Sequence, residues 1–288
     1  MKKNFILGTF VLMSTIVGVG MFGLPYAGMQ SGFLIIGLLL FILTVIMSTV
    51  HWFYADIVVK TNKNCRLPGY AGEHLGNKAK TIVGIFVILG LYGSLLVYII
   101  VGGNFLGTIL SEFLNLPAIY FNLIFFVIGS IAIYSGIKLI SGTDLLMGVF
   151  LIVIVLIFVL LGHNNVNFIN FKTINWQNLL IPYGAILYSL AGMSVIPEIR
   201  EMFKNSNKDK KYYKKAIVAG TIIPGVLYLV FIGIVIGLTG VNTTEEAING
   251  LIDVLGKKNC FTWFIAWVSC HHNIIFCVGI VIKTNIRL

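Results

Sequence analysis

Charged residues are scarce in this chain, and the acidic ones are the scarcer of the two signs. Asp, Glu, Lys and Arg together make up 10% of its 288 residues, whereas a soluble domain carries about 25%. The apolar share is 58% and the mean hydropathy is +0.97. This composition excludes a soluble globular protein. It predicts an all-α polytopic membrane protein, because backbone polar groups in lipid must find their hydrogen bonds within their own helix.

Cysteine is also rare, and the four cysteines form no disulfide framework. Three of them, Cys260, Cys270 and Cys277, lie in the last 29 residues beside His271 and His272. Their spacing is not that of a known metal site. The sequence also lacks a nucleotide-binding P-loop, a Rossmann fingerprint and the HExxH motif of zinc proteases. We therefore expect no metal, no cofactor and no enzymatic activity.

Long apolar segments are what the chain has in abundance. About 20 consecutive apolar residues cross the hydrocarbon core of a bilayer as one helix. The first segment is longer than the apolar core of a signal peptide, which has about 7–15 residues, so we interpret it as a span. The sequence predicts eight membrane spans, at residues 5–28, 33–59, 82–110, 118–137, 143–162, 178–198, 215–239 and 261–282.

The basic residues predict the orientation. With the N-terminus in the cytoplasm, 17 of the 20 Lys and Arg residues fall in cytoplasmic segments, and Lys172, Lys257 and Lys258 fall outside. Cytoplasmic loops carry an excess of Lys and Arg, so we expect a protein of the cytoplasmic (inner) membrane with its N-terminus inside. The net charge of +10 then reflects topology and contact with anionic lipid headgroups. No nucleic-acid partner is expected, with a nucleic-acid or partner site at Lys204–Lys215 as the alternative.

One short phrase occurs twice. Gly20–Pro25 and Gly192–Pro197 both read Gly-Met, two variable residues, an aliphatic residue and Pro, and the copies lie 172 positions apart. They lie inside the first and sixth predicted spans, which cross the membrane in opposite directions. Gly and Pro weaken or remove helical hydrogen bonds, and paired interrupted helices in two inverted halves mark the binding site of a secondary transporter. The pattern predicts two interrupted helices that share a site near the bilayer midplane.

An interrupted helix exposes backbone groups that suit one class of ligand. Gly18 and Gly20 have no side chain, so a ligand can approach their backbone, and Pro25 removes a helical N–H. The N-terminus of the following half-helix favours a carboxylate, and unwound carbonyl groups favour an ammonium group or a cation. An α-amino acid presents both groups. The alternative is ordinary helix packing, in which small residues let two membrane helices approach each other.

The blocks around these phrases resemble a known family. Residues 18–27 are similar to the first-span signature of the amino acid permeases grouped as the amino acid/auxin family and the bacterial tryptophan/tyrosine permeases, and residues 182–199 resemble their sixth span. The resemblance extends over roughly residues 5–240. It implies the LeuT-type fold of two inverted five-helix repeats, and amino acid uptake driven by protons or sodium.

The resemblance also implies which residues contact the substrate. By matching position, Gly18 and Gly20 face the substrate carboxylate, and Ser194 lies in the break of the sixth span. Tyr98, near the middle of the third span, corresponds to a substrate-side aromatic residue of the wider fold, with core packing as the alternative. The predicted substrate site consists of Gly18, Gly20, Met21, Phe22, Tyr98, Gly192 and Ser194.

The end of the chain departs from the family pattern. The LeuT-type fold needs ten helices, whereas this sequence predicts eight. We expect a single transporter domain over residues 1–288, with a first repeat at about 5–162 and an incomplete second repeat at about 178–288. The expected cause is a truncated or frame-altered reading of a longer gene. The alternative is a short member that dimerisation completes, so the oligomeric state stays open.

Three acidic residues lie nearest the membrane. Asp56, Asp144 and Glu198 all map near the cytoplasmic ends of spans, where solvation by water is the alternative to a role in proton transfer. Glu198 directly follows the Pro of the second phrase and is the candidate for proton coupling. The sequence thus predicts a secondary transporter that imports an amino acid, aromatic or otherwise neutral, by proton or sodium symport. The alternatives are a membrane sensor that binds an amino acid without moving it, and a non-functional fragment of a longer permease.

Overall fold

The chain is built from helices. This computed structural model describes residues 2–61, 63, 65–110, 114, 116–134, 144–203, 207–247 and 250–251, and these ranges contain no strand. The α-helices are α1 (Lys2–Ile16), α2 (Gly20–Ser31), α3 (Phe33–Thr61), α4 (Leu67–Leu75), α5 (Asn77–Leu110), α6 (Ala118–Tyr134), α7 (Asp144–Gly162), α8 (Ile181–Ser189), α9 (Ile196–Glu201) and α10 (Asn207–Thr239). Short 3-10 turns are η2 (His163–Asn165), η3 (Phe168–Phe171), η4 (Trp176–Asn178), η5 (Met193–Val195) and η6 (Gly240–Asn242).

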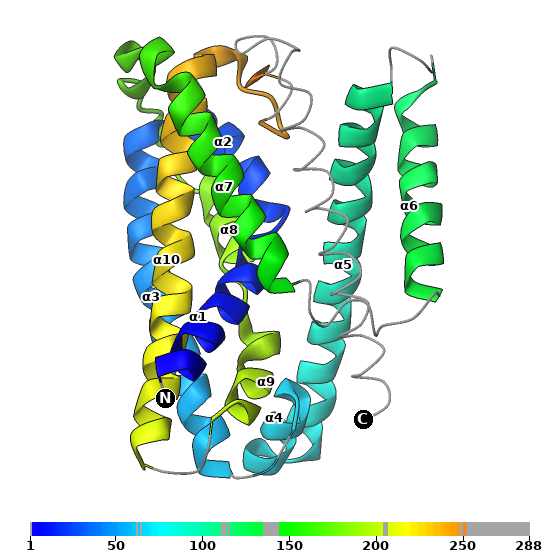
Figure 1. Ribbon diagram of the computed structural model, residues 1–288, viewed down its shortest axis with the longest axis vertical. Coiled ribbons are helices and arrows are strands. Elements are labelled where there is room, and N and C mark those ends of the chain that lie inside the picture. The colour runs from blue at the N-terminus through cyan, green and yellow to red at the C-terminus, as the bar shows by residue number, and fades with distance from the viewer. Residues whose placement is uncertain are drawn as a thin grey trace.

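Helix α10 forms the centre of the bundle. It packs against α1, α2, α3 and α7, and Figure 1 shows it running beside α3 over most of the height of the molecule. Its side chains Tyr213, Tyr228 and Phe231 are fully buried. Helix α5 stands to one side, where it packs against α4 and α6. Only 6% of the most apolar stretch of α5 is buried, as expected for a helix whose surface faces lipid.

Several helices are long and apolar enough to cross a membrane, which confirms a polytopic membrane protein. Within the described residues they are Phe33–Thr61, Asn77–Thr108 and Asp209–Asn242, with the bent pair α1–α2 as a fourth span. Two shorter apolar helices, Ala118–Ile131 and Val155–Asn165, fall at the fourth and fifth predicted spans. The eighth predicted span, 261–282, lies outside the described residues.

Two helices begin earlier than the apolar pattern predicts. Helix α5 starts at Asn77 instead of residue 82, and α10 starts at Asn207 instead of residue 215. The polar residues before each apolar segment are rich in Lys, a good helix former, and contain no Pro. Each helix therefore extends beyond its apolar segment. The lysines at 210, 211 and 214, which precede the predicted seventh span, therefore lie on the helix that forms this span.

The first predicted interruption is present, but Pro25 is not its cause. Helices α1 and α2 meet at 59° across a break at residues 17–19. The break thus precedes the repeated phrase, and Pro25 lies inside α2. The glycines at 18 and 20 lower the cost of leaving the helical conformation. A membrane helix tolerates an internal Pro when neighbouring groups satisfy the freed backbone.

The second interruption coincides with its phrase. Helix α8 ends at Ser189, η5 covers Met193–Val195, and α9 begins at Ile196. Gly192 precedes η5, and Pro197 occupies the first turn of α9, where a missing N–H costs no helical hydrogen bond. This second broken helix therefore consists of α8, a break at residues 190–192, η5 and α9.

The two broken helices run antiparallel. At one end, the side-chain amide of Asn4 donates to the carbonyl oxygen of Met202 at 2.7 Å, so the start of α1 lies beside the end of α9. At the other end, the Asn178 amide donates to the carbonyl oxygen of Gln30 at 3.1 Å, so the end of α2 lies beside the residues that precede α8. This is the relative direction that the sequence predicts for the first and sixth spans.

Most basic residues of the described helices gather at one end of the bundle. That end holds the N-terminus, α4, α9 and the start of α10, in the lower part of Figure 1. We call it the basic end, and its basic residues are Lys2, Lys3, Lys60, Lys63, Arg66, Lys78, Lys80, Arg200, Lys210, Lys211, Lys214 and Lys215. Lys172 lies at the opposite end, because its neighbour Asn170 donates to the carbonyl oxygens of Ile236 and Gly237 near the end of α10.

Candidate substrate site

The two breaks pack directly against each other. A Cβ added to Gly20 would lie 2.8 Å from Ser189 Oγ and 3.1 Å from the ring of Tyr188, both at the end of α8. A Cβ added to Gly192 would lie 2.7 Å from Cγ1 of Ile16, at the end of α1. Each glycine thus allows its break to approach the other broken helix closely. The packing role that small residues play between membrane helices is present at both phrases.

A buried tyrosine bonds both broken helices. Tyr228 on α10 is fully buried, and the single proton of its hydroxyl is shared between the carbonyl oxygens of Ile16, at 2.8 Å, and Ser189, at 2.9 Å. These are the last residues of α1 and α8, whose carbonyl groups lack an intrahelical partner. One hydroxyl therefore holds the ends of two half-helices together. The sequence carries no signal for Tyr228, which is one of 12 tyrosines and lies within an apolar helix.

Backbone donors lie at the start of α2. The N–H groups of Met21 and Phe22 donate to the carbonyl oxygens of Gly18, at 3.3 Å, and Val19, at 3.1 Å. The N–H groups of Gly18, Val19 and Gly20 have no acceptor within the described residues. The N-terminus of a helix carries partial positive charge, and a set of free N–H groups there binds an anionic group. The first break can therefore hold a carboxylate.

A cavity of about 340 Å³ lies between the breaks. Its walls come from α1, the start of α2, α3, α5, α8 and η5, from both breaks, and from the start of α4 with the residue before it. Small-molecule sites in proteins have volumes of about 300–1,000 Å³. The cavity is thus large enough for a small ligand, and the backbone of both broken helices reaches it.

Most of the predicted substrate residues line this cavity: Gly18, Gly20, Tyr98, Gly192 and Ser194. The side chains of Met21 and Phe22 do not. Both are buried in the core, where the ring of Phe22 packs edge-to-face against Phe105 and Phe231. Successive residues of a helix point about 100° apart, so the residues after Gly20 turn away from the cavity.

Helix α5 supplies one wall of the cavity, and Tyr98 is the residue of this wall that the sequence predicts. Val87, Leu91, Ser94 and Tyr98 all line the cavity. They follow one another at intervals of four, three and four residues, which places them on one face of the helix. This spacing is visible in the sequence, but α5 is apolar all round, so no face stands out from the others.

An ion pair lies at the basic end of the cavity. Arg66 lines the cavity, and its Nη1 lies 2.5 Å from Oε1 of Glu198. The two side chains are 18% and 26% exposed, so each charge depends on the other for compensation. Arg66 immediately precedes α4, and Glu198 lies in the first turn of α9. The predicted coupling acid is therefore ion-paired, and the pair joins α4 to the second broken helix.

Two further polar side chains of the spans, His51 and Asp56, have partners away from the cavity. His51 on α3 is fully buried, and its Nδ1 lies 2.9 Å from Thr221 Oγ1 on α10. Asp56 is ion-paired with Lys60 and Lys214 at the basic end. Within the described ranges, no group of three or more His, Cys, Asp or Glu residues could hold a metal ion. The cysteines at 260, 270 and 277 lie outside these ranges.

Comparison with known proteins places this chain among amino acid permeases. The chain is similar to a protein of Aliivibrio fischeri (strain ATCC 700601 / ES114) named "Glutamine transporter 2", with 23% identity over 255 residues. The match covers 86% of this chain and 65% of that relative, so the chain spans less than two thirds of the length of the relative. The model of the tryptophan/tyrosine permease family matches residues 1–268. These matches confirm the family resemblance of the two sequence blocks, and the chain belongs to the tryptophan/tyrosine permease family.

Proposed function

We propose that this chain binds an α-amino acid in the cavity between its two broken helices and imports it across the cytoplasmic membrane by proton or sodium symport. The observation that carries the proposal is the position of the free N–H groups at the start of α2, at a cavity of about 340 Å³ that both breaks line. Membership of a permease family and similarity to a relative named as a glutamine transporter support the same class of substrate.

The two charged groups of an α-amino acid match two kinds of group around the cavity. The substrate carboxylate binds the N–H groups of Gly18 and Gly20, which line the cavity, and the N-terminus of α2 adds a favourable field there. The substrate ammonium group lies toward the end of α8 at Ser189, because the C-terminus of a helix carries partial negative charge. The hydroxyl-bearing residues Thr15 and Ser194 line the cavity nearby and supply further hydrogen-bonding groups.

The walls favour a neutral side chain. Within the described residues no acidic group lines the cavity, and its basic residue, Arg66, is ion-paired with Glu198. A charged substrate side chain would be buried there without compensation, which is costly. Helix α5 presents the apolar Leu91 beside the hydroxyl-bearing Ser94 and Tyr98. Such a mixed surface suits an aromatic or amide-bearing side chain.

Transport requires the cavity to open to each side of the membrane in turn. We infer a LeuT-type arrangement, with a first repeat at about 5–162, an incomplete second repeat at about 178–288, and alternating access by movement of one bundle against the other. The basic end faces the cytoplasm. Glu198 is the proposed coupling acid, because it directly follows Pro197 in the first turn of α9 and is ion-paired with Arg66, which lines the cavity.

Ligand binding to the purified chain tests the site directly. We expect thermal-shift measurements over the twenty amino acids to show stabilisation by neutral ones. Gly20→Leu should abolish this shift, because a side chain there would fill the contact with Ser189 and Tyr188. Gly93→Leu is the matched control, since a Cβ at Gly93 meets nothing within 4 Å. Binding that survives Gly20→Leu, or that is lost equally in both variants, would refute the proposed contact at the first break.

Uptake separates the remaining alternatives. A sensor binds the amino acid but gives no accumulation in vesicles that carry a proton or sodium gradient. A transporter accumulates the amino acid that gave the thermal shift, and accumulation stops when the gradient is collapsed. A non-functional fragment shows neither a shift nor uptake with any of the twenty amino acids.

A further inference from the structure

A second concave surface lies on the outside of the bundle, away from the substrate cavity. It is a groove of about 790 Å³ between α3 and α10, lined by Trp52 on α3 and by side chains from Lys210 to Ile223 on α10. We call it the α3–α10 groove. Trp52, Ile222 and Ile223 are 38%, 44% and 43% exposed. These apolar side chains therefore face the lipid in a membrane-embedded protein.

One lysine of the groove is held in place. The ammonium group of Lys214 is ion-paired with Asp56 and lies 5.0 Å from the centre of the Trp52 ring. Asp56 also pairs with Lys60 at 2.8 Å, so this carboxylate is already shared between two cations. A cation over an aromatic face adds to the attraction. These contacts hold the side chains of Lys214 and Trp52 in place. Because Asp56 already pairs with two lysines, it does not neutralise the other lysines of the groove.

Three further lysines add positive charge to the groove. Lys210, Lys211 and Lys215 line it and form no ion pair with any residue that the structure describes. Asp209, in the same turn as Lys210, is 8% exposed and does not line the groove. The rim therefore has an excess of positive charge, and an anionic group is its complement.

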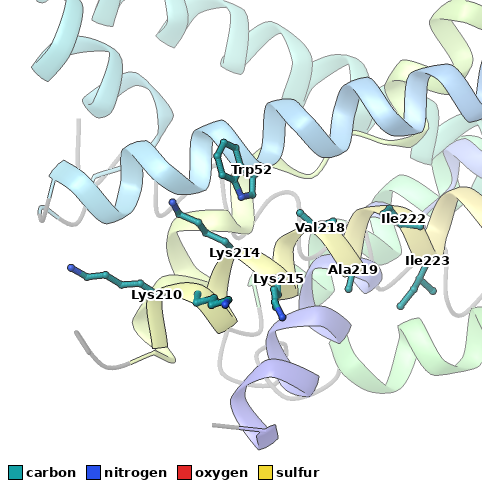
Figure 2. A pocket seen from close by; sticks show the side chains of 9 residues that line it. Trp52, Lys210, Lys214, Lys215, Val218, Ala219, Ile222 and Ile223 are labelled. Atoms are coloured by element: carbon teal, nitrogen blue, oxygen red, sulfur yellow. The ribbon is translucent and has the colours of Figure 1, made fainter. Parts of the chain in front are cut away.

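The lysines and the aliphatic residues follow each other along one face of α10. Lys211, Lys215, Val218 and Ile222 are spaced by four, three and four residues, which places them in a row on the helix. Figure 2 shows the lysines at one end of this stretch and the aliphatic side chains at the other. At 1.5 Å per residue, Ile222 lies about 16 Å from Lys211 along the axis. Lysines at the headgroup level thus put Ile222 within the hydrocarbon, with Trp52 near the interface, where Trp is enriched.

We propose that the α3–α10 groove binds an anionic phospholipid. The headgroup phosphate lies among Lys210, Lys211 and Lys215, and one acyl chain lies along Val218 and Ile222. Basic clusters at the cytoplasmic membrane surface attract anionic headgroups, and this groove adds an apolar channel that begins at the basic cluster. A zwitterionic headgroup fits less well, because its own cation would face the lysines. The proposal does not depend on transport.

Lipid retention by the purified full chain tests the charge requirement. Native mass spectrometry from detergent should show phosphatidylglycerol bound in preference to phosphatidylcholine with the same acyl chains. Lys211→Gln with Lys215→Gln should weaken phosphatidylglycerol binding about tenfold, since each lysine near the surface contributes measurably to binding of anionic lipid. Lys3→Gln with Lys78→Gln is the matched control, because both lysines are exposed at the basic end outside the groove. Equal weakening in both double variants, or none in the first, overturns the proposal.

The tryptophan of the groove reports on the acyl chain. Phosphatidylglycerol brominated on its acyl chains should quench the fluorescence of the wild-type chain in vesicles more than brominated phosphatidylcholine does, and this difference should vanish in Trp52→Phe. Ala219→Leu narrows the groove without changing its charge and should also weaken binding of phosphatidylglycerol. If phosphatidylglycerol still quenches more than phosphatidylcholine in Trp52→Phe, and by the same margin as in the wild type, the lipid does not bind in this groove.

Discussion

Arg66 Nη1 lies 2.5 Å from Glu198 Oε1 and joins the start of α4 to α9 at the basic end of the cavity. Both side chains are mostly buried, and α9 is the half-helix that follows the second break. Movement of α9 away from α4 would separate the two charges, so the pair favours the arrangement seen here. The pair therefore holds the second broken helix against the start of α4 through one carboxylate.

Removing the carboxylate charge tests this link. Glu198→Gln leaves Arg66 as a partly buried charge without its partner, and we expect the free energy of unfolding to fall by about 1 kcal/mol. A loss of this size lowers the melting temperature by about 2–4 °C in a chain of moderate size. If Glu198 is the coupling acid, uptake by the variant also loses its dependence on pH. Uptake with an unchanged pH profile would contradict that role.

The exposed pair Lys63–Glu73 provides the control for this change. Its atoms lie 2.6 Å apart, and its side chains are 58% and 42% exposed. The hydrogen bond from Lys63 holds the pKa of the Glu73 carboxyl below its usual value, so any stabilisation it gives is present at neutral pH and is lost as the pH falls through that lowered pKa. Because exposed pairs contribute little, Glu73→Gln should leave both the melting temperature and uptake unchanged.

The tyrosine that bonds both broken helices leads to a second prediction. Tyr228→Phe keeps the ring but leaves the buried carbonyl groups of Ile16 and Ser189 without their donor. We expect a loss of about 1–3 kcal/mol in stability, together with weaker amino acid binding, because both half-helix ends border the cavity. Tyr120→Phe is the control, since that side chain is 51% exposed. Unchanged melting temperature and binding in Tyr228→Phe would show that the hydroxyl does not hold the breaks.

The glycine of the second phrase gives a third prediction. A Cβ at Gly192 would lie 2.7 Å from Cγ1 of Ile16, which is too close, so Gly192→Ala should push the second break away from α1. We expect a lower melting temperature and weaker substrate binding. Gly184→Ala on α8 is the control, because a Cβ there meets nothing within 4 Å. Ala is the better helix former, so the control should be neutral or slightly stabilising, and equal losses in both variants would argue against the close approach.

The sequence predicts those parts of this fold that depend on local chain properties. Apolar segments predict the membrane helices, and the two Gly- and Pro-containing phrases predict both breaks. The exact position of the first break did not follow, because Pro25 is accommodated inside α2 while residues 17–19 unwind. The start of α10 at Asn207 was not predicted either. The hydropathy pattern stops at the lysines, but Lys is a good helix former, so the helix continues through them.

The contacts that complete the site join residues far apart in the chain. Tyr228 meets Ile16 across 212 positions, and Arg66 meets Glu198 through the packing of α4 near α9. No spacing rule within one segment connects such residues. Tyr98 and Gly192 were predicted as substrate residues for local reasons: the family resemblance indicates Tyr98, and the repeated phrase contains Gly192. The remaining wall of α5 lies on a helix without a distinct polar face.

The asymmetric distribution of basic residues predicts the orientation of the molecule. The basic end should face the cytoplasm, whereas η6 lies at the other end of the bundle, in the upper part of Figure 1. Lys78→Cys and Val241→Cys place single thiols at exposed positions of the two ends, and Val241 is 81% exposed. The background carries Ser at the native cysteines 65, 260, 270 and 277. In intact cells, a membrane-impermeant maleimide should label Val241→Cys and not Lys78→Cys, and permeabilised cells should show both labelled. The reverse pattern would place the N-terminus outside, and the amino acid would then meet the ion pair of Arg66 and Glu198 from the external side.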